Sequence, residues 1–216
     1  EAETSYGFDA SIEYYLDNGS LFSAAAFMRN IDNVIYADDS TIDAGAFIEE
    51  FAGEQWTYTG FLNGSDGKFS GIELNSVFFA DDFIQGLGLS ANVTFTDSEF
   101  RQANGETVGL PGTSDLIYNA AIFYEDYGIS ARLNYSWRDK WISPIEDPAE
   151  FWGEMTRLDA QISYTFPNQV SGSEVSVYAN FNNITDETDV RYAGNGTINQ
   201  AESYGMHYLI GVRVTY

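Results

Sequence analysis

Cysteine is absent from the 216 residues, and histidine occurs once, as His207. The sequence therefore has no disulfide framework, no thiolate nucleophile and no cysteine ligand for a metal. A single histidine also disfavours a zinc or iron site. Basic residues are scarce, with 9 against 33 acids and a formal net charge of −24. This balance excludes nucleic-acid binding and excludes attachment to an anionic membrane surface by charge alone, because both need clustered Lys and Arg.

Long hydrophobic runs are missing as well. The longest apolar stretches, such as residues 77–80, fall far short of the ~20 residues of a membrane-spanning helix. The first residues, Glu1, Ala2 and Glu3, lack the basic start and apolar core of a signal peptide, so we expect a mature form or a piece of a longer protein. Aromatic residues reach 16%, too many for a disordered acidic chain.

The sequence instead shows a strict alternation of apolar and polar residues. From Tyr204 to Tyr216 every second residue is apolar, and the residues between are small or polar except Leu209. Successive side chains of a strand point to opposite faces, so one face of this segment is apolar and the other can contact water. An apolar face that begins and ends in tyrosine is typical of a barrel strand in contact with lipid.

Nine strands with this alternation are predicted, and the connections between them alternate in length. The strands are expected at residues 4–16, 21–36, 56–79, 87–100, 115–125, 129–141, 156–166, 174–185 and 203–216. The turn at Asp17-Asn18-Gly19-Ser20 is read as a two-residue hairpin. Short turns on one side and long loops on the other indicate an all-β, transmembrane antiparallel β-barrel segment. In such barrels the long loops are extracellular, which places the C-terminus on the periplasmic side.

Nine is an odd number, whereas a bacterial barrel made of one chain closes with an even number. The sequence is therefore read as a segment whose missing strands come from elsewhere in the same or another chain, because open strand edges in lipid are costly. Three alternatives stay open: a complete small outer-membrane barrel of eight or ten strands, a secreted β-sandwich that binds carbohydrate through loop aromatics, and a barrel hydrolase that uses His207 with Ser203. No nucleophile-turn motif accompanies His207, so no enzyme is predicted.

Six short segments, in order, resemble the C-terminal part of TonB-dependent outer-membrane receptors. Residues 3–9 resemble the family's E-T-S-x-x-Y-E-x-G, residues 27–35 its F-x-x-x-I-D-N-x-I, and residues 71–74 its G-V/I-E-L. Residues 110–119 resemble L-P-G-T-S-x-x-x-Y-N, and residues 182–187 resemble x-N-L-T-D-E. The last strand, with Tyr208, Gly211, Val214 and Tyr216, resembles the strand recognised for membrane insertion, although phenylalanine is the commoner last residue.

The resemblance implies that residues 1–216 are the C-terminal portion, and the last nine strands, of a 22-stranded barrel. The family's plug domain and TonB-binding segment do not fit in this sequence. The implied function is energy-coupled uptake of a scarce nutrient (a siderophore, cobalamin, haem or an oligosaccharide) across the Gram-negative outer membrane. The implied partners are the rest of the barrel, the plug, the TonB system through the plug, and lipid or lipopolysaccharide.

Candidate ligand contacts are the aromatics in or beside long loops, namely Trp141, Trp152 and Tyr192. Their rings could stack on a sugar or a chelate, anchor loops, or lie at the membrane interface. Acidic residues gather in two loops and are candidate calcium ligands, although no EF-hand spacing is present and a solvated acidic surface is the alternative. They are Asp38, Asp39, Asp43, Glu49, Glu50 and Glu54 in the first loop, and Glu146, Asp147, Glu150 and Glu154 in the second. No other cofactor is predicted.

Overall fold

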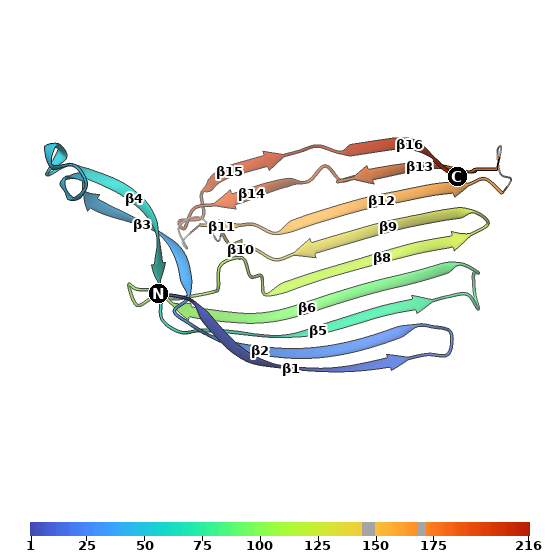
Figure 1. Ribbon diagram of the computed structural model, residues 1–216, viewed down its shortest axis with the longest axis horizontal. Helices are drawn as coiled ribbons and strands as arrows, with labels where there is room; N and C mark the ends of the chain where they lie inside the picture. The colour runs from blue at the N-terminus through green and yellow to red at the C-terminus, as the bar shows by residue number, and fades with distance from the viewer. Residues whose placement is uncertain (144–149, 168–171) are drawn as a thin grey trace.

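The computed structural model describes residues 1–143, 150–167 and 172–216, and these ranges consist mostly of strands (Figure 1). Two short 3-10 turns, η1 (Ala44–Ala46) and η2 (Glu49–Phe51), are the helical elements in them. None of these described residues forms a helix long and apolar enough to cross a membrane. The strands are β1 (Thr4–Tyr15), β2 (Leu21–Asp32), β3 (Ile35–Asp43), β4 (Gln55–Asn63), β5 (Gly67–Phe79), β6 (Leu87–Arg101), β7 (Thr107–Val108), β8 (Leu116–Asp126), β9 (Ile129–Arg138), β10 (Trp141–Ile142), β11 (Phe151–Trp152), β12 (Met155–Thr165), β13 (Glu174–Asn182), β14 (Thr188–Tyr192), β15 (Ile198–Ser203) and β16 (His207–Thr215).

Nine long strands form one antiparallel sheet in the order β1-β2-β5-β6-β8-β9-β12-β13-β16, and the two-residue β7 pairs beside β6. The nine-stranded antiparallel prediction is therefore confirmed. The strands β1 and β16 lie at opposite ends of this order and do not pair with each other, so the sheet does not close. An open sheet of this kind does not support the alternative of a complete small barrel.

Five of the predicted strands differ in extent by three residues or more, and the strands expected at 129–141 and 174–185 end early, at Arg138 and Asn182. The second ends at Asp32 rather than residue 36, because Asn33 has a left-handed φ of 58° and takes the chain out of the sheet. The third, expected at 56–79, consists of β4 and β5 with a break after Asn63. The last begins at His207 rather than residue 203, after Gly205 with a φ of 73°.

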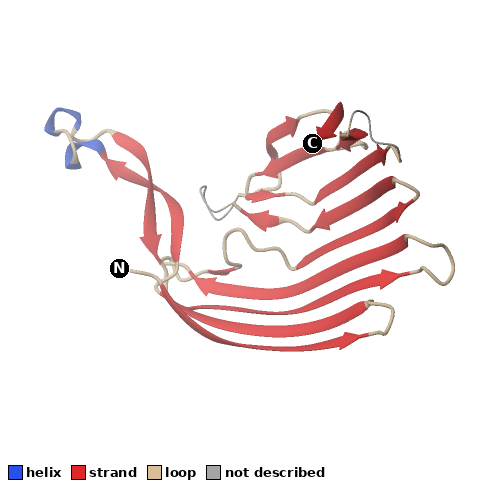
Figure 2. Ribbon diagram, turned by 45° about the vertical axis from the view of Figure 1, so that its right-hand side comes forward, coloured by secondary structure: helices blue, strands red, loops and turns tan. Residues whose placement is uncertain are grey.

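Connections predicted as loops contain most of β3 and the later short strands, whereas β4 lies in the segment predicted as the third strand. The strands β3 and β4 pair over nine residues and form a two-stranded ribbon that projects beyond the sheet (Figures 1 and 2). The later connections contribute β10, β11, β14 and β15, which make a separate four-stranded sheet. Short turns lie at the opposite end of the sheet, together with the C-terminus, as the alternation of lengths predicted (Figure 1).

The first short turn differs in type from the prediction. The Leu16 N–H donates to the Ser20 carbonyl at 2.8 Å, and the Gly19 N–H donates to the Leu16 carbonyl at 3.0 Å. This is a three-residue loop, in which Gly19 takes a φ of 84° that a residue with a side chain adopts at a cost. The two-residue hairpin was therefore wrong, although the glycine is needed for its positive φ.

Register places the alternating residues of all nine strands in common rows. One row consists of Ile12, Ala24, Leu74, Val93, Tyr118 and Trp137, which face each other across six successive strands. The next row toward the turns consists of Tyr14, Phe22, Ser76, Ala91, Ala120, Tyr135 and Leu158. These rows belong to one side of the sheet, which we call the apolar face, and the alternate residues form the polar face.

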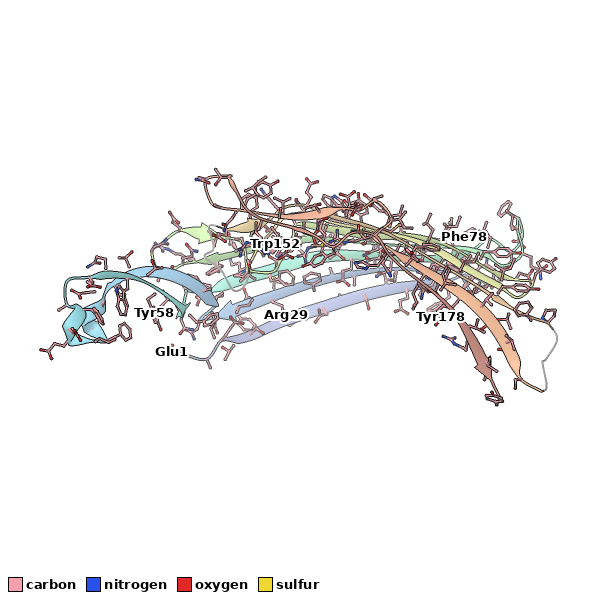
Figure 3. All side chains as sticks on the ribbon, turned by 90° about the horizontal axis from the view of Figure 1, so that it is seen from above. Glu1, Arg29, Tyr58, Phe78, Trp152 and Tyr178 are labelled. Atoms are coloured by element: carbon pink, nitrogen blue, oxygen red, sulfur yellow. The ribbon has the colours of Figure 1, made fainter. Side chains whose placement is uncertain are left out.

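Large apolar side chains remain exposed along the apolar face. Phe8 and Ile12 are each 73% exposed, and Val212 is 65% exposed. Within the described residues no second sheet packs on this face, and Figure 3 shows the sheet edge-on as a single curved layer. A soluble sandwich would bury such a face against its second sheet, so the sandwich alternative is not supported.

The apolar face covers most of the height of the apolar band of a membrane barrel. On β6 it runs from Leu87 to Phe95, about 27 Å along the strand. Beyond Phe95 the same face becomes polar, with Glu99 at 3.8 Å from Lys68 in an exposed ion pair. At the tilt of about 35–45° of outer-membrane barrel strands, this length covers about 19–22 Å, most of their apolar band of about 25 Å.

The small buried core of the chain lies at the loop end of the sheet. Val34, Tyr36 and Phe100 are at most 2% exposed, and Leu110 completes the cluster. Tyr36 and Phe100 are in ring contact at 5.3 Å, and the Tyr36 hydroxyl accepts a hydrogen bond from the Ala103 N–H at 3.0 Å. This core fixes the base of the β3–β4 ribbon against the connection that follows β6.

Candidate functional site

A row of asparagines crosses the middle of the polar face. The Asn92 amide donates to the Asn75 side-chain oxygen at 3.2 Å, and the Asn119 amide donates to Asn92 at 2.8 Å. The three residues face each other on β5, β6 and β8. A hydrogen-bonded amide row of this kind suits contact with water or with a polar polypeptide rather than with lipid.

Arginines also gather on the polar face, although the whole chain is acidic. Arg29 makes two hydrogen bonds of 2.8 Å to the Asp9 carboxylate. Arg132 donates to the Ser90 hydroxyl at 3.1 Å, and its guanidinium lies 5.6 Å from the centre of the Phe123 ring. Most of the few basic residues of the chain therefore lie on the polar face.

A hollow of about 700 Å³ lies on the polar face beneath the connection that holds residues 112–114. Its lining includes the Arg29–Asp9 pair and Glu73. The carboxylate of Glu73 makes no hydrogen bond or ion pair with any described residue. The hollow therefore presents one unpaired acid toward the inside of the curved wall.

Aromatic rings on the polar face cover glycines on the neighbouring strand. Phe27 faces Gly71, Phe123 faces Gly88, and Tyr178 faces Gly211. A Cβ added to Gly211 would lie 2.5 Å from two atoms of the Tyr178 ring and hydroxyl. Such cross-strand cover protects the bare backbone of a glycine within a sheet. The structure therefore gives Gly211 of the predicted insertion strand a packing role.

We expect Gly211→Ala to destabilise the sheet edge by about 1–3 kcal/mol, because Tyr178 must leave its position to make room for the methyl group. The measurement is urea unfolding of the assembled barrel, followed by its heat-dependent mobility on gels. The matched control is Gly109→Ala, whose added Cβ would be no closer than 3.5 Å to any atom. Equal stability of the two variants would contradict a packing role for Gly211.

Arg138 ties the loop end of the sheet together. Its guanidinium donates to the Ser114 hydroxyl at 2.8 and 3.1 Å and to the Gly112 carbonyl at 3.1 Å. Ser114 in turn donates to the Asp139 carbonyl at 2.8 Å. The L-P-G-T-S segment is therefore held against the end of β9, which explains why a small hydroxyl residue stands at 114.

The predicted aromatics Trp141 and Trp152 meet on the small loop sheet. Their rings are stacked, with centroids 6.0 Å apart and planes 14° apart. The Arg138 guanidinium lies 3.8 Å from the centre of the Trp141 ring, and the Arg191 guanidinium lies 5.8 Å from that of Trp152. Because neighbours occupy the ring faces, this Arg–Trp–Trp–Arg stack leaves the ring edges for any ligand and holds the loops in place.

Tyr192 does not join the two tryptophans. It faces Phe151 across the ladder, and the two rings stack at 5.3 Å and 18° on the opposite side of the small sheet. The structure therefore brings together two of the three predicted aromatics and separates the third. Ligand contact by any of them stays a prediction.

Sequence reasoning missed the two arginines that flank the tryptophans. Arg191 is paired with Glu150 at 3.5 Å and donates to the Gln200 side chain at 2.7 Å. Nearby, Arg157 forms an ion pair with the nearly buried Asp189. Arg138 lies on the polar side of a predicted alternating strand, which indicated its direction. Arg191 lies in a connection predicted as a loop, and no local pattern gave the partners of either arginine.

The connection after β13 is built around Asn183. This residue is 6% exposed and has a φ of 53°. Its side-chain oxygen accepts from the Glu187 N–H at 3.0 Å, and its amide donates to the Glu187 and Gly205 carbonyls, each at 3.3 Å. Its own N–H donates to Asp159 at 2.8 Å. The N-x-T-D-E segment is thus a turn that carries the chain out of the wall.

His207 begins β16 on the polar face, opposite Asn182. It is exposed, as is Ser203, the last residue of β15. No hydrogen bond joins His207 to Ser203 among the described residues. The arrangement gives His207 the position of a polar lining residue.

The acidic loops show no preformed metal site in the part of the chain that the structure describes, where no group of three or more His, Asp or Glu could hold a metal ion. In the first loop, hydrogen bonds from the Gly53 and Gly45 N–H groups hold the pKa of the Asp43 carboxyl below its usual value. In the second loop, Glu146 and Asp147 lie outside the described residues. Calcium binding there stays a prediction.

These features define the class of the protein: a section of transmembrane β-barrel wall with one face for lipid, one for a wet lumen, and long structured loops at one end. The family model described as TonB dependent receptor-like, beta-barrel, matches residues 1–184. The chain belongs to this family of outer-membrane receptors, as the six motifs predicted. No curated protein sequence matches the chain.

Solved receptors share the fold. The ferric-catecholate import receptor Fiu of E. coli K12 superposes with a TM-score of 0.64 at 15% identity, over 98% of this chain and 28% of that one. The siderophore receptor PiuA of Acinetobacter baumannii gives 0.63 at 17%, over 98% and 28%. A mutant of the ferric enterobactin receptor PfeA of Pseudomonas aeruginosa gives 0.63 at 17%, over 99% and 31%. This chain therefore spans less than a third of the length of these proteins. Their names describe receptors rather than enzymes.

Proposed function

We propose that the chain forms part of the wall and extracellular loops of an outer-membrane receptor that imports a scarce nutrient with energy from the TonB system. The observation that carries this proposal is the register of nine strands, which leaves one face continuously apolar and uncovered. Lipid can cover this face along its whole length while the opposite, polar face lines a wet lumen. The family membership adds the import function.

The end of the sheet with the long connections is the extracellular end, and the short turns and the C-terminus are periplasmic. Outer-membrane barrels have short periplasmic turns and long outer loops, and the distribution in this chain follows that rule. The ribbon and the Arg–Trp–Trp–Arg stack would then face the medium from which the nutrient comes. The strand with Tyr208, Val214 and Tyr216 would serve membrane insertion.

The missing strands and the plug come from elsewhere in the receptor. The outer edges of β1 and β16 pair with no other strand of the described residues, so additional strands of a larger barrel must cover them. The plug would lie against the polar face and would make the contact with TonB, and lipid or lipopolysaccharide would cover the apolar face. Residues 1–216 alone would form wall and loops without transport.

The nutrient is a ferric siderophore in our first hypothesis, because the named solved relatives are siderophore or ferric-catecholate receptors. Cobalamin, haem and oligosaccharides are the alternatives within the family. Among the described residues Arg138, beside Trp141, hydrogen-bonds only a hydroxyl and a carbonyl, so it supplies positive charge at the loop end, where the surrounding acids would otherwise repel an anionic chelate.

An epitope inserted after Gly53, at the exposed tip of the ribbon, should be labelled by antibody on intact cells. The same epitope after Asp82, in the turn between β5 and β6, should be labelled only once the outer membrane is permeabilised. Cells with either insertion should also take up radiolabelled ferric siderophore in a TonB-dependent way. Labelling in the reverse pattern would contradict the orientation, and unchanged iron uptake after deletion of the receptor would contradict the siderophore.

A further inference from the structure

The β3–β4 ribbon carries four aromatic rings on one side, well away from the wall (Figure 3, where Tyr58 is labelled). Phe47 stacks on Tyr58 with centroids 5.9 Å apart, and Phe51 contacts Trp56 at 5.3 Å. Phe47 is 64% exposed, Tyr58 48% and Trp56 38%. We call these four residues the ribbon aromatic face. Contiguous exposed apolar groups on a protein surface mark interaction sites.

Acids border the ribbon aromatic face, and no base lies near it in the sequence. Residues 30–67 contain no Lys, Arg or His. Glu49 and Glu50 are exposed in η2, beside Phe51. Glu54 accepts a hydrogen bond from the Trp56 indole at 3.3 Å. A ring surface bordered by carboxylates attracts cations in two ways, through charge and through the negative faces of the rings.

The shape of the ribbon favours a polypeptide over a small ligand. Its strands pair over nine residues, about 30 Å, and neither ribbon strand pairs with a third strand among the described residues. Free strand edges accept an added strand, and the rings beside them provide contacts for alternate side chains. The five hollows that described residues line lie on the wall and its connections rather than on the ribbon, whose extended shape gives a small molecule little enclosure.

We propose that the ribbon aromatic face is a docking surface for a basic polypeptide, whose Lys or Arg side chains lie over the rings and against the bordering carboxylates. The proposal rests on the part of the proposed function that makes this chain a barrel wall with its ribbon outside the membrane. It does not depend on which nutrient is imported. A small organic cation is the competing occupant, and the experiment separates the two.

The test uses the assembled receptor, purified in detergent, so that the direction of insertion in cells does not affect it. The probe is a fluorescein-labelled 12-residue peptide of alternating Lys and Leu, and binding is measured by fluorescence anisotropy. Tyr58→Ala and Phe47→Ala should each weaken binding about tenfold, because each removes a ring face that a cation covers. Two variants, one in the strand and one at the tip, guard against a local loss of folding.

The matched control is Phe61→Ala, which removes an aromatic side chain that is 68% exposed but lies on the opposite side of the ribbon. It should leave the affinity unchanged. Glu49→Gln combined with Glu50→Gln should weaken binding and reduce its salt dependence. An equal loss for Phe61→Ala and Tyr58→Ala would overturn the proposal, as would displacement of the peptide by tetramethylammonium at the same concentration, which would indicate a small-cation site.

Discussion

Val93→Arg should destabilise the assembled barrel by about 1–3 kcal/mol, the cost of an arginine between the middle and the end of the lipid-facing part of a strand. Val93 lies in the apolar row between Leu74 and Tyr118, and it is the fourth of the five apolar positions from Leu87 to Phe95 on β6. Lipid offers the guanidinium neither water nor a carboxylate at that depth. The measurement is urea unfolding in lipid vesicles, with the folded fraction read from heat-dependent gel mobility.

The control for this substitution is Thr94→Arg, one residue further along the same strand. Thr94 lies on the polar face directly opposite Glu73, the acid without a partner. The new arginine can pair with that carboxylate, so we expect a change below about 1 kcal/mol. Similar costs for the two variants would mean that the two faces do not meet lipid and water, and the membrane interpretation would be wrong.

Asn183→Ala should cost about 2–4 kcal/mol, because it combines a left-handed φ with the loss of buried hydrogen bonds. The Glu187 N–H and the Gly205 carbonyl would lose their side-chain partner, and alanine tolerates the φ of 53° less well than asparagine does. The measurement is again urea unfolding of the assembled barrel. Asn183→Gly should recover the part of the loss that is due to the backbone.

The neighbouring residue provides the control. Asn182 is exposed at the end of β13, and its side chain makes no hydrogen bond with a described residue. Asn182→Ala should therefore change the stability by less than about 0.5 kcal/mol. If both asparagines proved equally tolerant, the motif at 182–187 would have no structural role in leaving the wall.

The family motifs lie where the chain passes between the wall and a loop. Glu3 accepts a hydrogen bond from the Ile35 N–H at 2.8 Å. Asn33, with its left-handed φ, forms the turn between β2 and β3. Ser114 and Asn183 likewise hydrogen-bond the backbone at two later points where the chain leaves the sheet. These positions need special backbone angles or a side chain that caps the backbone, which few residue types supply. Because few residue types fit these positions, the motifs can be recognised in the sequence.

The sequence predicts two members of the aromatic stack but not the arginines beside them. Trp141 and Trp152 were named from their place in long loops, and the structure stacks them together. Their flanking arginines come from positions 138 and 191, and the stack joins four strands that are up to 53 residues apart. Cross-strand neighbours depend on register between distant segments, which a local pattern does not contain. Tyr192 falls on the other side for the same reason.

The sequence by itself determined the wall. Alternation with a period of two is a local property, so it assigned side chains to an apolar or a polar face in every long strand, and the nine strands and their short turns followed. The tertiary structure alone decided what the long connections do. The ribbon of β3 and β4, the stack around Trp141 and the cover of Gly211 by Tyr178 each depend on pairing between segments, because the free energy of those contacts exists only once the strands have met.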